Sequence, residues 1–160
     1  MEINLQQTIL RNLLTNDEYT RKVAAFLQPD YFEGVYRSLF VEFTKYIAKY
    51  NSLPTVEAFK IEVDSADRMT EEHYRHAMDI LPNIFDYQKE DLRWLLDSTE
   101  KWCQERAVFN DVMESITVVD GKHQTLSKNS IPDILSKALS VSFDTNIGHD
   151  YLENVYERFY

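Results

Sequence analysis

Two histidines, His73 and His76, come nearest in this sequence to a metal-binding pattern. They lie three residues apart with Glu72 and Asp79 close by, and on a helix this spacing places both imidazoles on one face. A polar helix usually presents such histidines to water, and a zinc site needs four ligands in a fixed geometry. We therefore assign no metal-ligating residue and keep an all-α metal hydrolase only as a control hypothesis.

Other catalytic patterns are equally weak. No arrangement of Ser, His and Asp suggests a nucleophilic site, and the three glycines (Gly34, Gly121 and Gly148) are isolated, so no Gly-rich loop could hold a phosphate. The single cysteine, Cys103, excludes an internal disulfide and is expected to be a small buried hydrophobic residue. We predict a helical interaction module with no catalytic residue and no cofactor of its own.

Composition supports a folded, mainly helical chain. Of the 160 residues, 44% are hydrophobic and 13% aromatic, whereas three Gly and four Pro leave few turns. The net charge of −10 repels phosphate backbones and disfavours autonomous binding to nucleic acid. Without a signal peptide or an apolar run of ~18 residues, the chain is expected to be a soluble cytoplasmic protein with no membrane contact.

The longest predicted element is a helix over Lys89–Val119, which contains no Gly and no Pro. Steps of three and four residues place a seam along one face, and a second apolar row lies beside it. The seam comprises Leu92, Leu95, Thr99, Trp102, Arg106, Phe109, Met113 and Ile116, and the second row comprises Leu96, Cys103, Ala107, Val108, Val112 and Val119. Two rows indicate two partners, one of them in another subunit, although a long core helix of a monomeric bundle would show the same pattern.

Short polar residues mark the other helix starts. We read Thr15 with Glu18 as a capping box, Thr55 and Ser130 as N-caps, and Thr70 as the opening of a further helix. The helix after Thr55 carries Val56, Phe59 and Ile61 as its apolar positions, and Pro82 is expected to close the helix that begins after Thr70.

An aromatic stripe follows the helix predicted within Tyr31–Tyr50. A stripe of this kind can stack bases, but basic residues are too few here to hold a nucleic-acid backbone. We assign it to the core: Phe32, Tyr36, Leu39, Phe40, Phe43, Tyr46, Ile47 and Tyr50.

The predicted fold class is all-α, in three parts. Residues 1–88 form a small helical bundle, residues 89–144 a long antiparallel helical hairpin of Lys89–Val119 against Ser130–Phe143, and residues 145–160 the start of a linker helix. The apolar face of the last segment comprises Tyr151, Leu152, Val155, Tyr156 and Phe159.

Several stretches resemble the replicative DNA helicases of T-even-type phages, which are relatives of the bacterial DnaB helicase. The most specific stretches are Gln104–Asn110 and Ile131–Asp144, the latter followed by Gly148-His149-Asp150. Asp30-Tyr31-Phe32 and Ser52-Leu53-Pro54-Thr55 are similar to the DnaB-type N-terminal domain in the same order along the chain.

The resemblance implies an N-terminal domain that pairs through its hairpin into the collar of a hexameric helicase. It implies primase as a partner, with a helicase loader as a further candidate. In that family a RecA-like motor, which uses ATP and magnesium and binds single-stranded DNA, follows a linker helix. The motor's Gly-x-x-x-x-Gly-Lys-Ser/Thr loop is absent from these 160 residues, so we expect no ATP hydrolysis or unwinding by this chain alone.

Two sets of residues follow from this assignment. The predicted subunit interface comprises Leu92, Leu95, Leu96, Trp102, Arg106, Phe109, Met113, Ile116, Leu135, Leu139 and Phe143. The predicted linker-docking residues, which would meet a neighbouring motor, are Tyr151, Leu152, Val155, Tyr156 and Phe159. The alternative is a stand-alone helical adaptor or inhibitor that mimics a helicase N-terminal domain, and gene sequence downstream of Tyr160 would separate the two.

Overall fold

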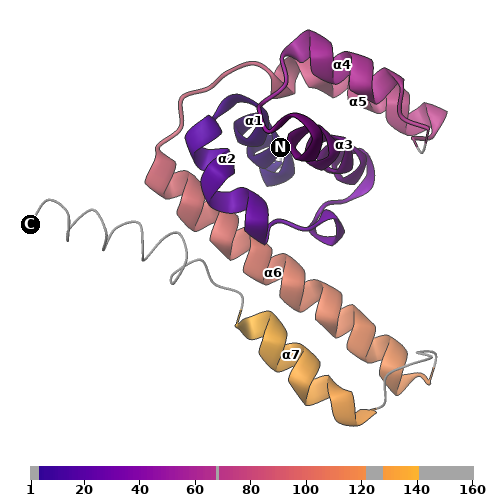
Figure 1. The fold of residues 1–160 in the computed structure, drawn as a ribbon. Helices are drawn as coiled ribbons and strands as arrows, with labels where there is room; N and C mark the ends of the chain where they lie inside the picture. Colours follow the sequence, from indigo (N-terminus) through magenta and orange to yellow (C-terminus); the bar gives the residue numbers. More distant parts are fainter. Residues whose placement is uncertain (1–3, 68, 122–127, 141–160) are drawn as a thin grey trace, which may run out of the picture. The chain divides into compact units, whose positions relative to one another are not determined.

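The computed structural model describes residues 4–67, 69–121 and 128–140 (Figure 1). These residues form α-helices and short 3-10 turns without a strand, so the predicted all-α class is confirmed. The helices are α1 (Leu5–Thr15), α2 (Asp17–Val23), α3 (Gly34–Tyr50), α4 (Val56–Asp64), α5 (Glu71–Ile84), α6 (Leu92–Val119) and α7 (Ile131–Leu139). The chain divides into two compact units, residues 1–95 and 96–160, at a point inside α6, and the predicted three-part division remains a prediction.

An asparagine, not the predicted threonine, starts α2. The Asn16 side chain accepts a hydrogen bond from the Tyr19 amide at 3.1 Å, whereas the Thr15 hydroxyl donates to the Arg11 carbonyl at 2.6 Å inside α1. The capping box at Thr15 is therefore wrong by one residue, because the extended backbone that a cap requires occurs at Asn16. The buried Thr20 hydroxyl donates to the Leu13 carbonyl at 2.7 Å and links α2 to α1.

The aromatic stripe of α3 lies in the core of the first unit, as predicted. Phe32, Phe40 and Phe43 are almost fully buried, and the rings of Phe32 and Phe40 stack with centroids 4.6 Å apart. Tyr50 marks the limit of this burial: it lies at the end of α3 and is exposed. Helix α3 packs against α1, α4 and α5 (Figure 1). The buried rings of its stripe therefore lie at the centre of the bundle.

Both predicted helix starts at Thr55 and Thr70 are confirmed by side-chain caps to Ala58 and His73, each at 3.1 Å. The apolar face of α4 is shifted from the predicted one. Phe59 and Val63, one turn apart, are buried, whereas Ile61 is 64% exposed. The short run of apolar residues in α4 does not define a face by itself, and packing on α3 and α5 chooses it.

Pro82 does not close α5, because the helix continues to Ile84. The fully buried Leu81 and Ile84 lie three residues apart on one face, and their burial holds the last turn together. Arg11 of α1 donates from Nε and Nη2 to the Asn83 carbonyl at 3.2 and 3.0 Å, which satisfies an acceptor at the end of α5.

Helix α6 begins at Leu92, three residues after the predicted start, because Asp91 acts as its cap. The Asp91 carboxylate accepts from the Trp94 amide at 2.9 Å. Further along α6, Cys103 has no exposed surface, and burial together with the nearby charge of Glu100 raises its thiol pKa to about 12.

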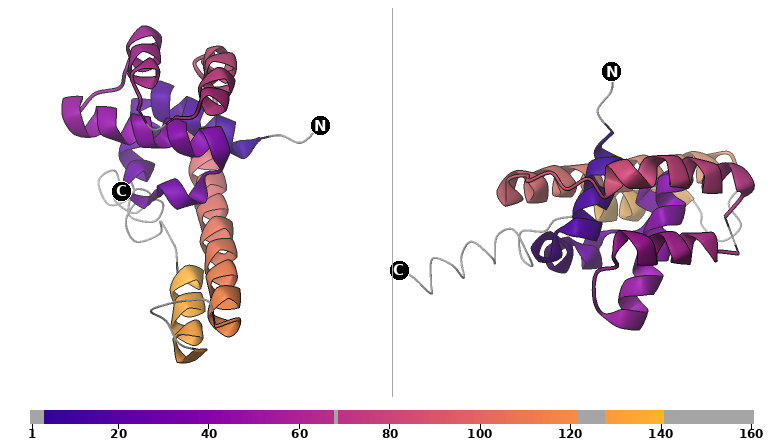
Figure 2. Two further views of the ribbon diagram at one scale, coloured as in Figure 1. Left: turned by 90° about the vertical axis from the view of Figure 1, so that its right-hand side faces the viewer. Right: turned by 90° about the horizontal axis from the view of Figure 1, so that it is seen from above.

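Helix α7 begins at Ile131, directly after Ser130, as predicted. It lies beside the C-terminal half of α6 and runs in the opposite direction (Figures 1 and 2). The connecting turn at 122–127 and the end of the predicted second arm, including Phe143, lie outside the described residues. The full hairpin over 89–144 therefore remains a prediction.

Replacing Asn16 with alanine should lower the free energy of unfolding by about 1 kcal/mol, because the Tyr19 amide loses its cap. Thr15→Ala is the matched control, since its hydroxyl only bonds back within α1, and its effect should stay below ~0.5 kcal/mol. Urea unfolding followed by circular dichroism compares the two. A larger loss for Thr15→Ala would restore the capping box at Thr15.

The native Cys103 thiol should resist iodoacetamide at pH 8 and react once the chain is unfolded. Its folded pKa of about 12 lies above the ordinary value of 9.0, so the native thiol stays protonated at this pH. The same shift stabilises the fold below pH 9 and loses this effect as the pH rises toward 12. Lys101→Cys, exposed two residues away, is the reactive control, and equal labelling rates at both cysteines would contradict the burial of Cys103.

Candidate interaction surface on helix α6

Five apolar side chains on the C-terminal half of α6 face solvent. Phe109, Val112, Met113, Ile116 and Val119 are between 40% and 56% exposed. Their steps of three, one, three and three residues place them on one helix face over ~15 Å, from a rise of ~1.5 Å per residue. We call these five residues the α6 stripe. A contiguous apolar face of this kind is typical of a protein interaction site.

An arginine borders the α6 stripe at its N-terminal end. The Arg106 guanidinium lies 4.9 Å from the centroid of the Phe109 ring, within the range of a cation–π interaction. This contact orients the Phe109 ring on the surface of the helix and places a positive charge beside an apolar face. A partner surface that covers Phe109 would therefore also meet the guanidinium.

The predicted interface residues fall into two groups along α6. Those in its N-terminal part are buried: Leu95, Leu96 and Trp102 expose 8% or less, and Leu92 is half-buried. Those from Phe109 onward are exposed. The sequence pattern treated the seam as one continuous contact, but only its second half is open to a partner in this chain.

The face of α6 beside α7 is more polar than the stripe. Burial and the neighbouring carboxylate of Glu114 raise the pKa of Asp111, whereas Lys137 of α7 acts in the opposite direction. One turn later the Ser115 hydroxyl is buried and has no hydrogen-bond partner within the described chain. Helix α7 thus meets α6 near a polar position, Asp111.

Helix α7 itself contributes unevenly to the predicted interface. Leu135 is half-buried, whereas Leu139 is 73% exposed at the end of the helix. Phe143 and the five linker-docking residues, Tyr151, Leu152, Val155, Tyr156 and Phe159, lie outside the described residues.

Val112 and Val119 belong to the predicted second apolar row, beside the seam. In the structure they share the exposed face with Phe109, Met113 and Ile116. Their spacing to the seam residues would have indicated this face, but the pattern could not show which of several apolar faces is covered.

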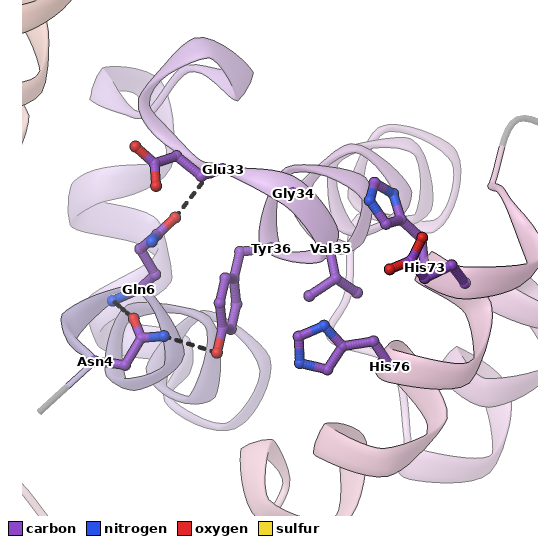
Figure 3. Close-up of a pocket in the computed structure, with 9 residues that line it drawn as sticks. Asn4, Gln6, Glu33, Gly34, Val35, Tyr36, His73 and His76 are labelled. Atoms are coloured by element: carbon purple, nitrogen blue, oxygen red, sulfur yellow. Dashed lines mark hydrogen bonds between the residues drawn. The ribbon is translucent and has the colours of Figure 1, made fainter. Parts of the chain in front are cut away.

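His73 and His76 line a pocket of about 370 Å³ in the first unit (Figure 3). Its other walls are the starts of α1 and α3, where Asn4 Nδ2 donates to the Tyr36 hydroxyl at 2.7 Å and the Glu33 amide donates to Gln6 Oε1 at 2.8 Å. Within the described ranges, no group of three or more His, Cys, Asp and Glu side chains could hold a metal ion. The pocket therefore offers hydrogen bonding and ring contacts, not a ligand set for a metal.

A second hollow of about 400 Å³ lies between the start of α2 and the chain leading into α6. Its lining includes the carboxylates of Asp17, Glu18, Glu90 and Asp91 but only one cation, Lys89. This balance repels phosphate, in agreement with the net charge of −10. In the described part of the chain, no helix is long and apolar enough to cross a membrane.

No family model matches the chain. The sequence is similar to the DnaB-like replicative helicase of Enterobacteria phage T4, with 29% identity over 161 residues. The similarity covers 95% of this chain and 34% of that protein, so the chain spans about a third of its relative's length. The resemblance drawn from the residues is therefore confirmed, and this chain is a homologue of the DnaB-like replicative helicase of phage T4.

Proposed function

We propose that this chain serves as the N-terminal oligomerisation and primase-docking domain of a phage replicative DNA helicase. The homology to a replicative helicase supports the replication role. The α6 stripe carries the oligomerisation role, because it is an apolar face that the described chain leaves open. In this proposal the stripe, with Leu139 of α7, pairs with another copy of the chain.

The energetics favour a pairing of moderate strength. Burying the remaining exposed half of each stripe residue gains about 1 kcal/mol, so the ten side chains of a pair gain about 10 kcal/mol. Association costs about 4–15 kcal/mol in lost translational and rotational freedom. This cost is similar in size to the gain from burying the two stripes. The stripe alone should therefore support reversible association, and a stable ring would need further contacts.

The remaining activities are assigned to the parts of a longer helicase. A RecA-like motor would bind ATP, magnesium and single-stranded DNA in the cytoplasm of the host cell, and the linker-docking residues Tyr151, Leu152, Val155, Tyr156 and Phe159 would meet a neighbouring motor. The net charge of −10 suits contacts with proteins such as primase or a helicase loader better than contacts with DNA.

The alternative is a stand-alone adaptor or inhibitor that uses the same surface to bind a helicase. Such a protein would associate with the helicase but have little need to pair with itself. Self-association of this chain, together with a downstream nucleotide-binding loop in the gene, would favour the helicase domain.

Self-association should weaken when the stripe is made polar. We expect Met113→Gln with Ile116→Gln to raise the dissociation constant at least about tenfold, a change of ~1.4 kcal/mol. Both side chains are about half exposed, so circular dichroism and unfolding should stay close to wild type. Sedimentation velocity over a concentration series gives the dissociation constants. The matched control is Lys101→Gln with Glu105→Gln, two exposed polar positions of the same helix. A wild-type protein that stays monomeric at high concentration, or an unchanged double variant, would contradict the role of the stripe.

Binding to single-stranded DNA should be weak at physiological salt. The chain has 27 acidic residues and only 17 basic ones, so it can neutralise few phosphates. Fluorescence anisotropy with a labelled oligonucleotide measures it, and lower salt should strengthen whatever binding occurs. Sub-micromolar affinity at moderate salt would show that a local basic face had been overlooked.

A further inference from the structure

The described structure leaves one apolar face open on α6, and the sequence predicts a second one near its end. One is the α6 stripe, from Phe109 to Val119. The other is known from the sequence alone, since Tyr151–Phe159 places five apolar residues at helical spacing and lies outside the described residues. We propose that Tyr151–Phe159 docks on the α6 stripe of its own chain and competes there with a second copy. The competition rests on the proposed self-association; the docking does not.

The position of α7 makes this docking possible. Helix α7 runs back along α6, so its C-terminal end points toward the N-terminal end of α6 (Figures 1 and 2). Eleven residues separate Leu139 from Tyr151. They can span up to ~36 Å at ~3.3 Å per residue, against a stripe only ~15 Å long. The segment can therefore reach every residue of the stripe.

Two physical terms favour the chain's own segment over a second copy. A short tether gives the segment an effective concentration in the millimolar range, well above that of a free partner in dilute solution. Each copy also carries a net charge of −10, so two whole chains repel each other, whereas the segment 151–160 adds only two carboxylates and one arginine. A segment rich in Tyr and Phe also offers large apolar rings to cover Phe109 and Met113.

Docking would tune self-association. While the segment occupies the stripe, the surface available to a second copy is reduced. If another surface captures the segment, the stripe opens and pairing becomes stronger. The chain would then form its oligomer only when its C-terminal segment is engaged elsewhere.

Chemical crosslinking tests the docking directly. Val112→Cys with Val155→Cys is treated with a short bismaleimide at low protein concentration, and native Cys103 stays in place because it is buried with a thiol pKa of about 12. The expected product is a crosslinked monomer that joins residues 112 and 155, identified by peptide mass. Lys101→Cys with Val155→Cys is the control on a polar part of α6 and should crosslink at least about fivefold less. Crosslinked dimers alone would show that a second copy is the occupant, and yields equal to the control would show that the segment does not dock; either result overturns the proposal.

A second measurement tests the competition. Val155→Ser with Phe159→Ser should strengthen self-association at least about threefold by sedimentation, whereas Asn154→Ser should not. Unchanged association in a protein that does self-associate would overturn the competition. If neither protein associates, the proposed oligomerisation is wrong and the competition falls with it, while the crosslink still decides whether the segment docks.

Discussion

Helix α6 has apolar residues on more than one face, and this excess of apolar surface governs the second unit. Burial of Leu96, Cys103 and Ala107 satisfies part of that surface within the chain. Lys137 of α7 lies close enough to act on Asp111, and the buried Ser115 hydroxyl has no hydrogen-bond partner within the described residues. The stripe from Phe109 to Val119 is exposed to water. Burial of these side chains by another molecule or another segment would lower the free energy.

The first unit buries a core of its own inside the bundle, although Tyr50 and Ile61 remain exposed. Phe32, Phe40 and Phe43 fill its centre, and Asn16, Thr55 and Thr70 satisfy the free amides of three helix starts. Arg11 donates two hydrogen bonds to the Asn83 carbonyl at the end of α5.

Charge and apolar surface together narrow the kind of partner. Phosphate backbones are disfavoured by the net charge and by the carboxylates around the hollow beside α2. An exposed apolar face bordered by Arg106 suits protein contacts instead. This combination supports the proposed role in contacts between proteins.

Local chemistry in the sequence determined most of the fold. Caps at Thr55 and Thr70, the core role of the α3 aromatics and a helix ending at Val119 all depend on residues within one or two turns, so they could be predicted. Local rules failed where tertiary packing competed with them. Asn16 displaced Thr15 as a cap, the burial of Leu81 and Ile84 carried α5 past Pro82, and packing on α3 and α5 turned Ile61 outward. The candidate surface shows the same limit. Helical spacing identified the apolar residues of α6, but only the tertiary structure decided that Trp102 is buried and Met113 is exposed. The physical reason is that burial depends on neighbours distant in sequence.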